Sequence, residues 1–260
     1  MAVLAGPDGQ STADDRRERL KQVFLQARGC TRCAQLAAAR TNVVFGAGHA
    51  DAALMLVGEV PSAREDEQGV PFTGAAGKLL DDLLESIGVP REDVFVTHAL
   101  KCRPPGNRDA DPSEVAKCRP YLEEQVRLVR PRVICTLGNF ATRALTGDAA
   151  LVTERHGRPE EVVIGGTAVY VVPLYHPAAA LYTRTLLDTL RADFAALPEL
   201  LARPVLPQPL REPEPAPPGH AAAEQEALPA APEQGRGPEP GPQPAAEPGE
   251  EPPPPQLGLF

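Results

Sequence analysis

The chain has 260 residues, with 26 Lys and Arg against 35 Asp and Glu, which gives a formal net charge of −9. No apolar run approaches the roughly 20 residues that a membrane span needs, and the first residues lack the apolar core of a signal peptide. Five cysteines, an odd number without an export signal, argue against a disulfide framework. The composition therefore predicts a cytoplasmic protein without a membrane partner, whose cysteines bind metal or pack in the core.

The charge and the prolines are unevenly distributed along the chain. Residues 204–260 hold 18 of the 31 prolines and nine glutamates but only two arginines, which is −7, and the other 203 residues carry −2. A Pro/Glu-rich segment cannot bury enough apolar surface to offset its ordering entropy. We therefore expect disorder over residues 1–13 and 204–255, and one packed domain over residues 14–203.

Helical and strand-like patterns alternate along the predicted domain. In chain order they predict a helix over residues 14–27, a strand over 52–57, a helix over 78–87, a strand over 94–97, a helix over 112–129, a strand over 133–137, a short helix over 139–145, a hairpin of strands 162–164 and 168–174, and a helix over 185–201. This alternation predicts an α/β fold with a mostly parallel sheet covered on both faces. Ligands of such sheets bind beyond the carboxyl ends of the strands.

Four of the five cysteines have the spacing of metal ligands. Cys30 and Cys33 are separated by two residues, Cys102 and Cys118 by 15, and 68 residues lie between the two pairs. Two residues between thiols let both sulfurs reach one metal centre from a single turn. The four thiolates suit zinc and an iron–sulfur cluster equally well, and core packing is the simpler alternative. Cys135, inside the apolar segment VICTL, is expected to be a core residue.

Titratable side chains stand at or just after the ends of three predicted strands. Glu59 follows the first strand, His98 the second and His176 the last. Each of them alone would more often be a solvated carboxylate or a structural histidine than a functional group. Because parallel strands end at the same edge of a sheet, we expect the three side chains to line one crevice.

Together these residues resemble a known family. The segments GEVPSAREDEQGVPFTGAAGKLL, VTHALKCRPPGNR and YHPAA, with the four cysteines, are similar to the family 4 uracil-DNA glycosylases, the iron–sulfur type of bacteria and archaea. The resemblance covers roughly residues 30–201. It implies a three-layer α/β/α glycosylase fold, a 4Fe-4S cluster on the four cysteines with zinc as the minor alternative, and a monomer that excises uracil from DNA in the nucleoid and leaves an abasic site.

The resemblance also implies a role for each residue near the strand ends. His176 donates a hydrogen bond to O2 of the leaving base, and Glu59 with the backbone of Val60 and Pro61 frames the base and the attacking water. Phe72 stacks on the uracil ring. Such an enzyme must extrude its target base from the duplex into a pocket, and then stabilise the negative charge that grows on the base.

Two positions depart from the family pattern. His98 stands where the family usually has asparagine, whose amide can accept from uracil N3–H and donate to O4 together, whereas an imidazole offers one nitrogen at that edge. We therefore expect His98 to favour another deaminated base or to lower base selectivity. Val60 and Ser62 stand where the family has smaller residues, often glycine, and Val60 is expected to reduce activity by crowding the water.

Basic residues surround the second pair of cysteines. Because the domain is not basic overall, positive potential for DNA phosphates must be local, and an ordinary solvated face is the alternative. The residues expected to supply it are Lys101, Arg103, Arg108, Lys117 and Arg119.

The last five residues, QLGLF, are apolar in an otherwise polar tail. They resemble the QLxLF-type motif by which bacterial replication and repair proteins bind the sliding clamp, with Gln256 in one pocket and Leu259 and Phe260 in another. Leu257 completes this clamp-binding peptide, and residues 204–255 would act as its tether. Two competing hypotheses remain from the sequence: a weakly active or non-catalytic damaged-DNA reader that binds the clamp, and a zinc- or iron–sulfur-dependent redox or nucleic-acid module.

Overall fold

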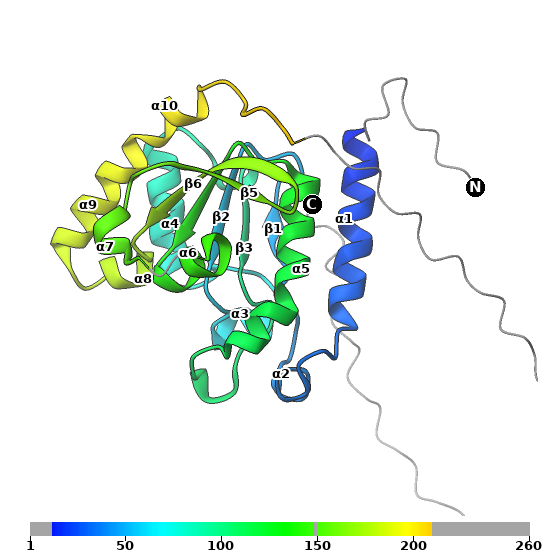
Figure 1. The fold of residues 1–260 in the computed structure, drawn as a ribbon. Coiled ribbons are helices and arrows are strands. Elements are labelled where there is room, and N and C mark those ends of the chain that lie inside the picture. Colours follow the sequence, from blue (N-terminus) through cyan, green and yellow to red (C-terminus); the bar gives the residue numbers. More distant parts are fainter. Residues whose placement is uncertain (1–11, 148–149, 210–260) are drawn as a thin grey trace, which may run out of the picture. The chain divides into compact units, whose positions relative to one another are not determined.

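The computed structural model describes residues 12–147 and 150–209. The expectations for residues 1–11 and 210–260, which include the clamp-binding peptide, lie outside these residues. The described part is built on one six-stranded sheet in the order β1-β3-β2-β4-β6-β5 (Figure 1). Its strands are β1 (Ala47–Gly48), β2 (Leu54–Gly58), β3 (Phe95–His98), β4 (Val133–Leu137), β5 (Glu160–Ile164) and β6 (Thr167–Leu174).

The four central strands are parallel, as predicted. β3 pairs with β2, β2 with β4, and β4 with β6 in parallel register. The two edge strands, β1 and β5, pair antiparallel with β3 and β6. Gly165 and Gly166 connect β5 to β6, both at positive φ, and so form the predicted hairpin. Every residue of β2, β3 and β4 is buried, as expected for parallel strands with both faces covered.

Helices cover both faces of this sheet. The α-helices are α1 (Ala13–Arg28), α2 (Ala34–Ala39), α3 (Ala63–Gln68), α4 (Ala75–Ser86), α5 (Pro112–Val129), α6 (Asn139–Thr146), α7 (Val152–Arg155), α8 (Pro177–Ala180), α9 (Arg184–Ala195) and α10 (Leu197–Leu201), with 3₁₀ turns η1 (Arg91–Asp93) and η2 (Pro105–Asn107). α1 and α5 lie on one side of the sheet and α4, α9 and α10 on the other (Figure 1). The three-layer α/β/α arrangement is thereby confirmed.

Successive side chains along each strand point to opposite faces of the sheet, which divides the core into two clusters. Met55 and Val57 of β2 pack with α1 and α5, whereas Leu54 and Leu56 pack with α4 and α9. This is the side-chain period of two that a strand imposes. Cys135 is fully buried in the second cluster, as the sequence predicted.

The last predicted helix, residues 185–201, is in fact two helices. α9 ends at Ala195, and α10 begins at Leu197 with Pro198 in its first turn. Proline has no backbone N–H and its ring clashes with the carbonyl four residues earlier, which favours a break in the helix just before Pro198. The prediction also missed β1 and the short helices α2, α3, α7 and α8.

Helix α5 has the predicted bounds because its N-terminus is strongly specified. The Asp111 side chain accepts a hydrogen bond from Ser113 N, and the Glu114 side chain accepts one from Asp111 N, which together form a capping box. Pro112 occupies the first turn. The helix directs Cys118 and Tyr121 toward the core. It therefore connects the sheet to the cysteine-containing segments.

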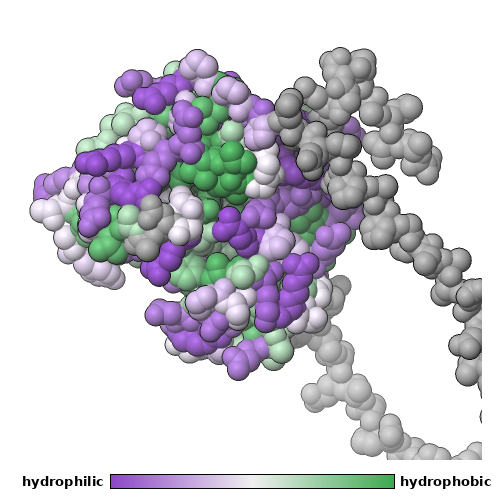
Figure 2. Space-filling model, in the orientation of Figure 1, coloured by the Kyte–Doolittle hydropathy of each residue, from purple (hydrophilic) through white to green (hydrophobic). Residues whose placement is uncertain are grey.

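The surface of the described part is mostly polar. Figure 2 shows hydrophilic side chains over much of one face, with an apolar area where Figure 1 draws β5 and β6. Val163 of β5 is one of the few large apolar side chains that are exposed. Among the described helices, none combines the length and apolarity that a bilayer span requires.

Candidate active site and thiol group

The ends of the parallel strands bring distant residues together at one edge of the sheet. Gly58, the last residue of β2, is the register partner of His98 at the end of β3. At the end of β4, Gly138 N donates to Leu174 O over 2.8 Å, and a Cβ on Gly138 would lie 3.5 Å from His176 Cβ. Glu59, His98 and His176 thus stand at or just after the ends of β2, β3 and β6, three of the four parallel strands, at the same edge of the sheet, as the sequence argument required.

The ring of Phe72 lies against both histidines. Its centroid is 5.1 Å from that of His98 with 16° between the planes, and 5.7 Å from that of His176 with 21° between the planes. Phe72 has a left-handed backbone with φ of 59°, and a Cβ on Gly77 would lie 1.7 Å from Phe72 O. The segment that presents Phe72 is therefore held tightly against the start of α4.

Gly58 forms the wall beside these rings. A Cβ at this position would lie 2.5 Å from His98 Nδ1 and 3.0 Å from Phe72 Cε2. The first distance is too short for a real Cβ contact and the second is very tight, so any larger residue would displace the His98 ring and press on that of Phe72. The glycine is thus required by close approach of side chains.

Glu65 is a buried carboxylate at this site that the sequence reasoning did not single out. Its Oε1 accepts a hydrogen bond from Phe72 N, its Oε2 accepts from Ser62 N at 2.7 Å, and Oε2 lies 3.4 Å from His98 Nε2. Burial alone would raise the pKa of Glu65, but the His98 contact and the two backbone donors outweigh it and lower the pKa to about 2. The capping pattern Ser62-x-x-Glu65 was the available sequence signal.

His98 is almost completely buried and poorly satisfied. Within the described residues, neither ring nitrogen makes a hydrogen bond, although Nε2 faces the Glu65 carboxylate at ion-pair distance. A buried polar atom without a partner costs free energy unless a ligand supplies the partner. His98 therefore has hydrogen-bonding capacity left for a bound molecule.

The tautomer of His176 is determined by the backbone that follows it. Ala178 N donates to His176 Nδ1 over 3.1 Å at the first turn of α8, so the neutral ring carries its proton on Nε2. Burial, reinforced by nearby His98 and opposed by Glu65, lowers the pKa of His176 to about 4. His176 is therefore a neutral hydrogen-bond donor at physiological pH.

Glu59 follows Gly58 directly and is half-buried. Burial raises the pKa of its carboxyl, as does nearby Asp109, while Arg143 opposes them. Its backbone carbonyl accepts from Leu100 N over 3.1 Å. The structure thus brings Phe72, His98 and His176 into ring contact, and leaves Glu59 at the same strand edge with Asp109 and Arg143 as its charged neighbours.

Val60 and Pro61 continue this segment. Val60 is partly buried against the α1–α5 side of the core, and Pro61 is buried. Ser62 caps α3 with its side chain and donates its backbone N–H to Glu65. The serine therefore has a structural reason to stand where a smaller residue was expected, because it begins the helix that carries Glu65.

The four cysteines of the predicted cluster are close enough to affect one another's ionisation. Cys102 and Cys118 are buried and Cys30 and Cys33 half-buried. Burial raises the pKa of Cys118 to about 11, partly opposed by Lys101, while Cys102 and Cys30 raise it further. Among the described residues, no three His, Cys, Asp or Glu side chains are arranged to hold a single metal ion.

Two hydrogen bonds already point at these sulfurs. Arg40 Nη1 donates to Cys102 Sγ and Lys101 N donates to Cys118 Sγ, both over 3.3 Å. Donors of this kind stabilise thiolates, which are the metal-binding form of cysteine. The donor set therefore fits a thiolate-ligated cluster.

The expected basic patch for DNA is partly wrong. Lys101 is buried, and its Nζ donates to Thr97 Oγ1, His98 O and Gln125 Oε1 over 2.6 to 2.7 Å. Burial, opposed by Cys118 and Cys102, lowers the pKa of Lys101 to about 7.

Two of the other expected cations are paired with carboxylates. Arg108 forms an ion pair with Glu114, and Arg119 forms one with Glu123, which reduces the positive charge that the two arginines present to a phosphate. Burial and pairing of these side chains are decided by packing, which the sequence pattern does not show.

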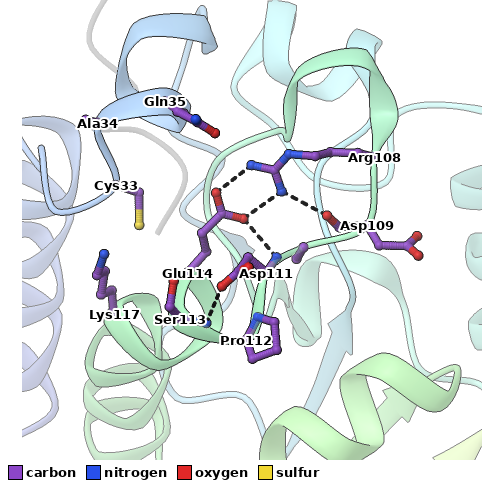
Figure 3. Close-up of a pocket in the computed structure, with 11 residues that line it drawn as sticks. Cys33, Ala34, Gln35, Arg108, Asp109, Asp111, Pro112, Ser113, Glu114 and Lys117 are labelled. Atoms are coloured by element: carbon purple, nitrogen blue, oxygen red, sulfur yellow. Dashed lines mark hydrogen bonds and ion pairs between the residues drawn. The ribbon is translucent and has the colours of Figure 1, made fainter.

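A polar pocket of about 610 Å³ opens beside Cys33. Lys117 lies near the Cys33 sulfur, and the paired side chains of Arg108 and Glu114 form the opposite side (Figure 3). The remaining lining residues belong to the beginning of α2 and to the segment that leads into α5. The pocket therefore adjoins the four predicted cluster cysteines through Cys33, and none of the predicted uracil-binding residues lines it.

Two large side chains are exposed just after the short helix that His176 caps. Leu181 and Tyr182 follow α8 and are 39% and 91% exposed. The sequence reasoning missed them because an exposed aromatic residue has no periodic signal. Their exposure leaves them available to contact a large partner such as DNA.

Comparison with known proteins agrees with this architecture. The sequence model of the family described as the uracil DNA glycosylase superfamily matches residues 45–200, which include the whole sheet and helices α4, α5 and α9 but not α1. The chain therefore belongs to the uracil DNA glycosylase superfamily, and within it to the type-4 enzymes, as the following relatives show.

Three of the relatives that carry the name type-4 uracil-DNA glycosylase show this. The protein of Archaeoglobus fulgidus is 42% identical over 190 residues, which are 72% of this chain and 95% of the relative. The protein of Sulfurisphaera tokodaii is 38% identical over 73% of this chain and 87% of its own length. That of Saccharolobus solfataricus is 41% identical over 71% of this chain and 88% of its own length. The family prediction made from the sequence motifs is confirmed.

Proposed function

We propose that this chain is a monofunctional DNA glycosylase that hydrolyses the N-glycosidic bond of uracil in DNA and leaves an abasic site. The observation that carries the proposal is the neutral His176 ring, whose Nε2–H is accepted by no other described residue, beside the ring of Phe72. Membership of the uracil DNA glycosylase superfamily and the type-4 relatives support the same reaction.

The chemistry asks for stabilisation of charge on the leaving base. As the bond from deoxyribose C1′ to uracil N1 breaks, negative charge grows on the base, and His176 Nε2–H is the donor assigned to O2. Phe72 provides a flat apolar surface on which the base stacks. Glu59, with its raised pKa, frames the sugar side together with Val60 and Pro61, and an attacking water is oriented there.

Extrusion of the base requires contact with the duplex. Leu181 and Tyr182 are exposed directly after the helix that His176 caps, so they approach DNA when His176 reaches the base. Apolar side chains inserted between base steps offset the few kcal/mol that unstacking costs. We assign this segment to the DNA-facing side of the site.

His98 is proposed to set base selectivity. His98 Nε2 is directed at Glu65, so only Nδ1 remains to hydrogen-bond the base. A histidine therefore makes one hydrogen bond to the base edge, where the amide of an asparagine can make two. We expect release of uracil with weaker rejection of other deaminated bases, such as hypoxanthine or xanthine, than the asparagine variant His98→Asn shows.

An alkali-cleavage assay on duplexes that each contain one lesion tests both statements. Release of uracil supports the function, and a wider set of released bases for the natural chain than for His98→Asn supports the role of His98. Strand cleavage at no lesion, with binding to lesion DNA retained, would contradict the enzyme and favour a damaged-DNA reader.

We further propose that four cysteines hold a 4Fe-4S cluster: Cys30, Cys33, Cys102 and Cys118. The proposal is supported by the hydrogen bonds that Arg40 and Lys101 donate to two of the sulfurs, and by the type-4 relatives. The cluster would cross-link the segment after α1 to the loop after β3 and to α5. Cys118→Ser is expected to lose bound iron and visible absorbance. Cys135→Ala is the matched control, because Cys135 is buried away from these thiols, and it should keep its iron. Equal iron in both variants, or zinc in place of iron, would contradict the assignment.

The C-terminal peptide is proposed to bind the bacterial sliding clamp through Gln256, Leu257, Leu259 and Phe260. A tethered monomer would then be concentrated near newly made DNA in the nucleoid. Deletion of residues 256–260 is expected to abolish co-elution with the purified clamp and to leave uracil release from short oligonucleotides unchanged. Clamp binding that survives the deletion would place the docking site elsewhere.

A further inference from the structure

A second histidine, outside the predicted site, contacts the segment that carries His176. His156 caps the C-terminus of α7, and its Nδ1 lies 2.9 Å and 3.1 Å from the two carboxylate oxygens of Asp193 on α9. Its ring centroid is 5.0 Å from that of Tyr175, the residue directly before His176, with 39° between the planes. Neither His156 nor Asp193 has a role in the reaction described above.

The backbone around His156 is built for this contact. Gly157 N donates to Pro173 O over 2.9 Å, which binds the turn after α7 to the end of β6. Gly157 has φ of 70°, and a Cβ there would lie 2.4 Å from Asp193 Oδ1. A glycine is therefore needed both for the backbone conformation and for the approach of the carboxylate.

The contacts of His156 connect α9 to the segment that carries His176, the proposed hydrogen-bond donor to the base. Asp193 is only 10% exposed in its side chain and holds His156 Nδ1–H, which orients the imidazole. The imidazole packs on Tyr175, and Tyr175 is partly buried against the α4–α9 side of the core. Because Tyr175 and His176 are consecutive, we expect displacement of the Tyr175 ring to rotate the backbone that aims His176. A misplacement of about 1 Å at a reacting group can cost 100-fold in rate.

We propose that His156 is a positioning residue for the glycosylase reaction, acting through its ring contact with Tyr175 to aim His176, with Asp193 holding the His156 ring. The inference rests on the proposed function. It also makes a structural statement about the orientation of His176 that is measurable without activity.

Two substitutions distinguish the ring contact that would aim His176 from the hydrogen bond that only joins α7 to α9. His156→Phe keeps an aromatic ring on Tyr175 but loses the Asp193 bond, whereas His156→Asn keeps a donor for Asp193 but loses the ring. If the ring contact aims His176, His156→Asn and His156→Ala should lower the single-turnover rate roughly 10-fold, and His156→Phe should remain within about threefold of the natural chain. The reverse order, with Asn active and Phe slow, would show that the tie between α7 and α9 is what matters and would overturn the proposal.

A double variant and a spectroscopic readout complete the test. In a His176→Ala background, His156→Asn should cause no further loss, because the residue that it positions is gone. The ring ¹⁵N signals of His176 should shift in His156→Asn and stay unchanged in His49→Ala, a substitution of an exposed histidine. Unshifted signals would overturn the positioning role whatever the activity. Absence of uracil release by the natural chain, with these signals shifted, would instead contradict the proposed function alone.

Discussion

Replacement of His176 by alanine is expected to slow single-turnover excision of uracil by two to three orders of magnitude, about 3 to 4 kcal/mol of transition-state stabilisation. The reason is the tautomer that Ala178 N imposes, which leaves Nε2–H as the donor for the leaving base. Because the pKa of His176 is lowered to about 4, the donor is present unchanged through the neutral pH range.

The matched control for His176 is His49→Ala. His49 is exposed and lies before β2, so its loss should leave the rate unchanged. Rates are measured with enzyme in excess over a short uracil-containing duplex, followed by alkali. A His176→Ala rate within threefold of the natural chain, in protein whose circular dichroism is unaltered, would remove His176 from the reaction.

Replacement of Glu65 by alanine is expected to cost about 3 kcal/mol of unfolding free energy, because hydrogen bonds to a charged group each contribute roughly 1.5 to 3 kcal/mol. The substitution leaves Ser62 N and Phe72 N without their acceptor and removes the carboxylate that faces His98. Phe72 and His98 would both lose their support, so uracil release should fall together with stability. Chemical denaturation and the excision assay measure the two effects.

Glu67→Ala is the matched control, since Glu67 lies on the same short helix and is exposed. It should change stability by less than about 0.5 kcal/mol. If Glu65→Ala were as stable as Glu67→Ala, the buried carboxylate would not be what holds Phe72 and His98.

Glu65 also predicts how stability depends on pH. Its pKa is lowered in the folded state from an ordinary 4.5 to about 2, so the folded protein binds this proton less readily than the unfolded chain. The stabilisation is therefore fully present above pH 4.5 and is lost as the pH falls from there toward 2. Glu65→Gln cannot ionise, and its unfolding free energy should fall less steeply across that window than that of the natural chain. Parallel curves would contradict the lowered pKa.

Much of the architecture follows from local sequence patterns. Continuous apolar runs give β2 and β4, and the capping residues Asp111 and Glu114 with Pro112 give α5 the bounds that were predicted. The order of strands and helices was enough for a mostly parallel sheet. It was also enough to predict that Glu59, His98 and His176 belong to segments at one strand edge, because parallel strands all end on the same side.

Other features depend on contacts between segments distant in the chain, which no local pattern encodes. Glu65 reads as an ordinary capping residue until β3 brings His98 to 3.4 Å from it. Lys101 reads as a surface cation until Thr97, His98 and Gln125 enclose its ammonium group. His156 acquires its proposed role only because α9 and the segment after β6 bring Asp193 and Tyr175 into contact with its ring.

By itself the sequence determined the order of the elements, which follows from its hydrophobic periodicity, and it showed the family and the residues at the strand ends, which its motifs carry. Tertiary structure alone decided which of those residues are buried, which tautomer His176 adopts and which carboxylate supports His98. The physical reason is that burial and hydrogen-bond partners shift protonation states, and both are set by packing across the sheet.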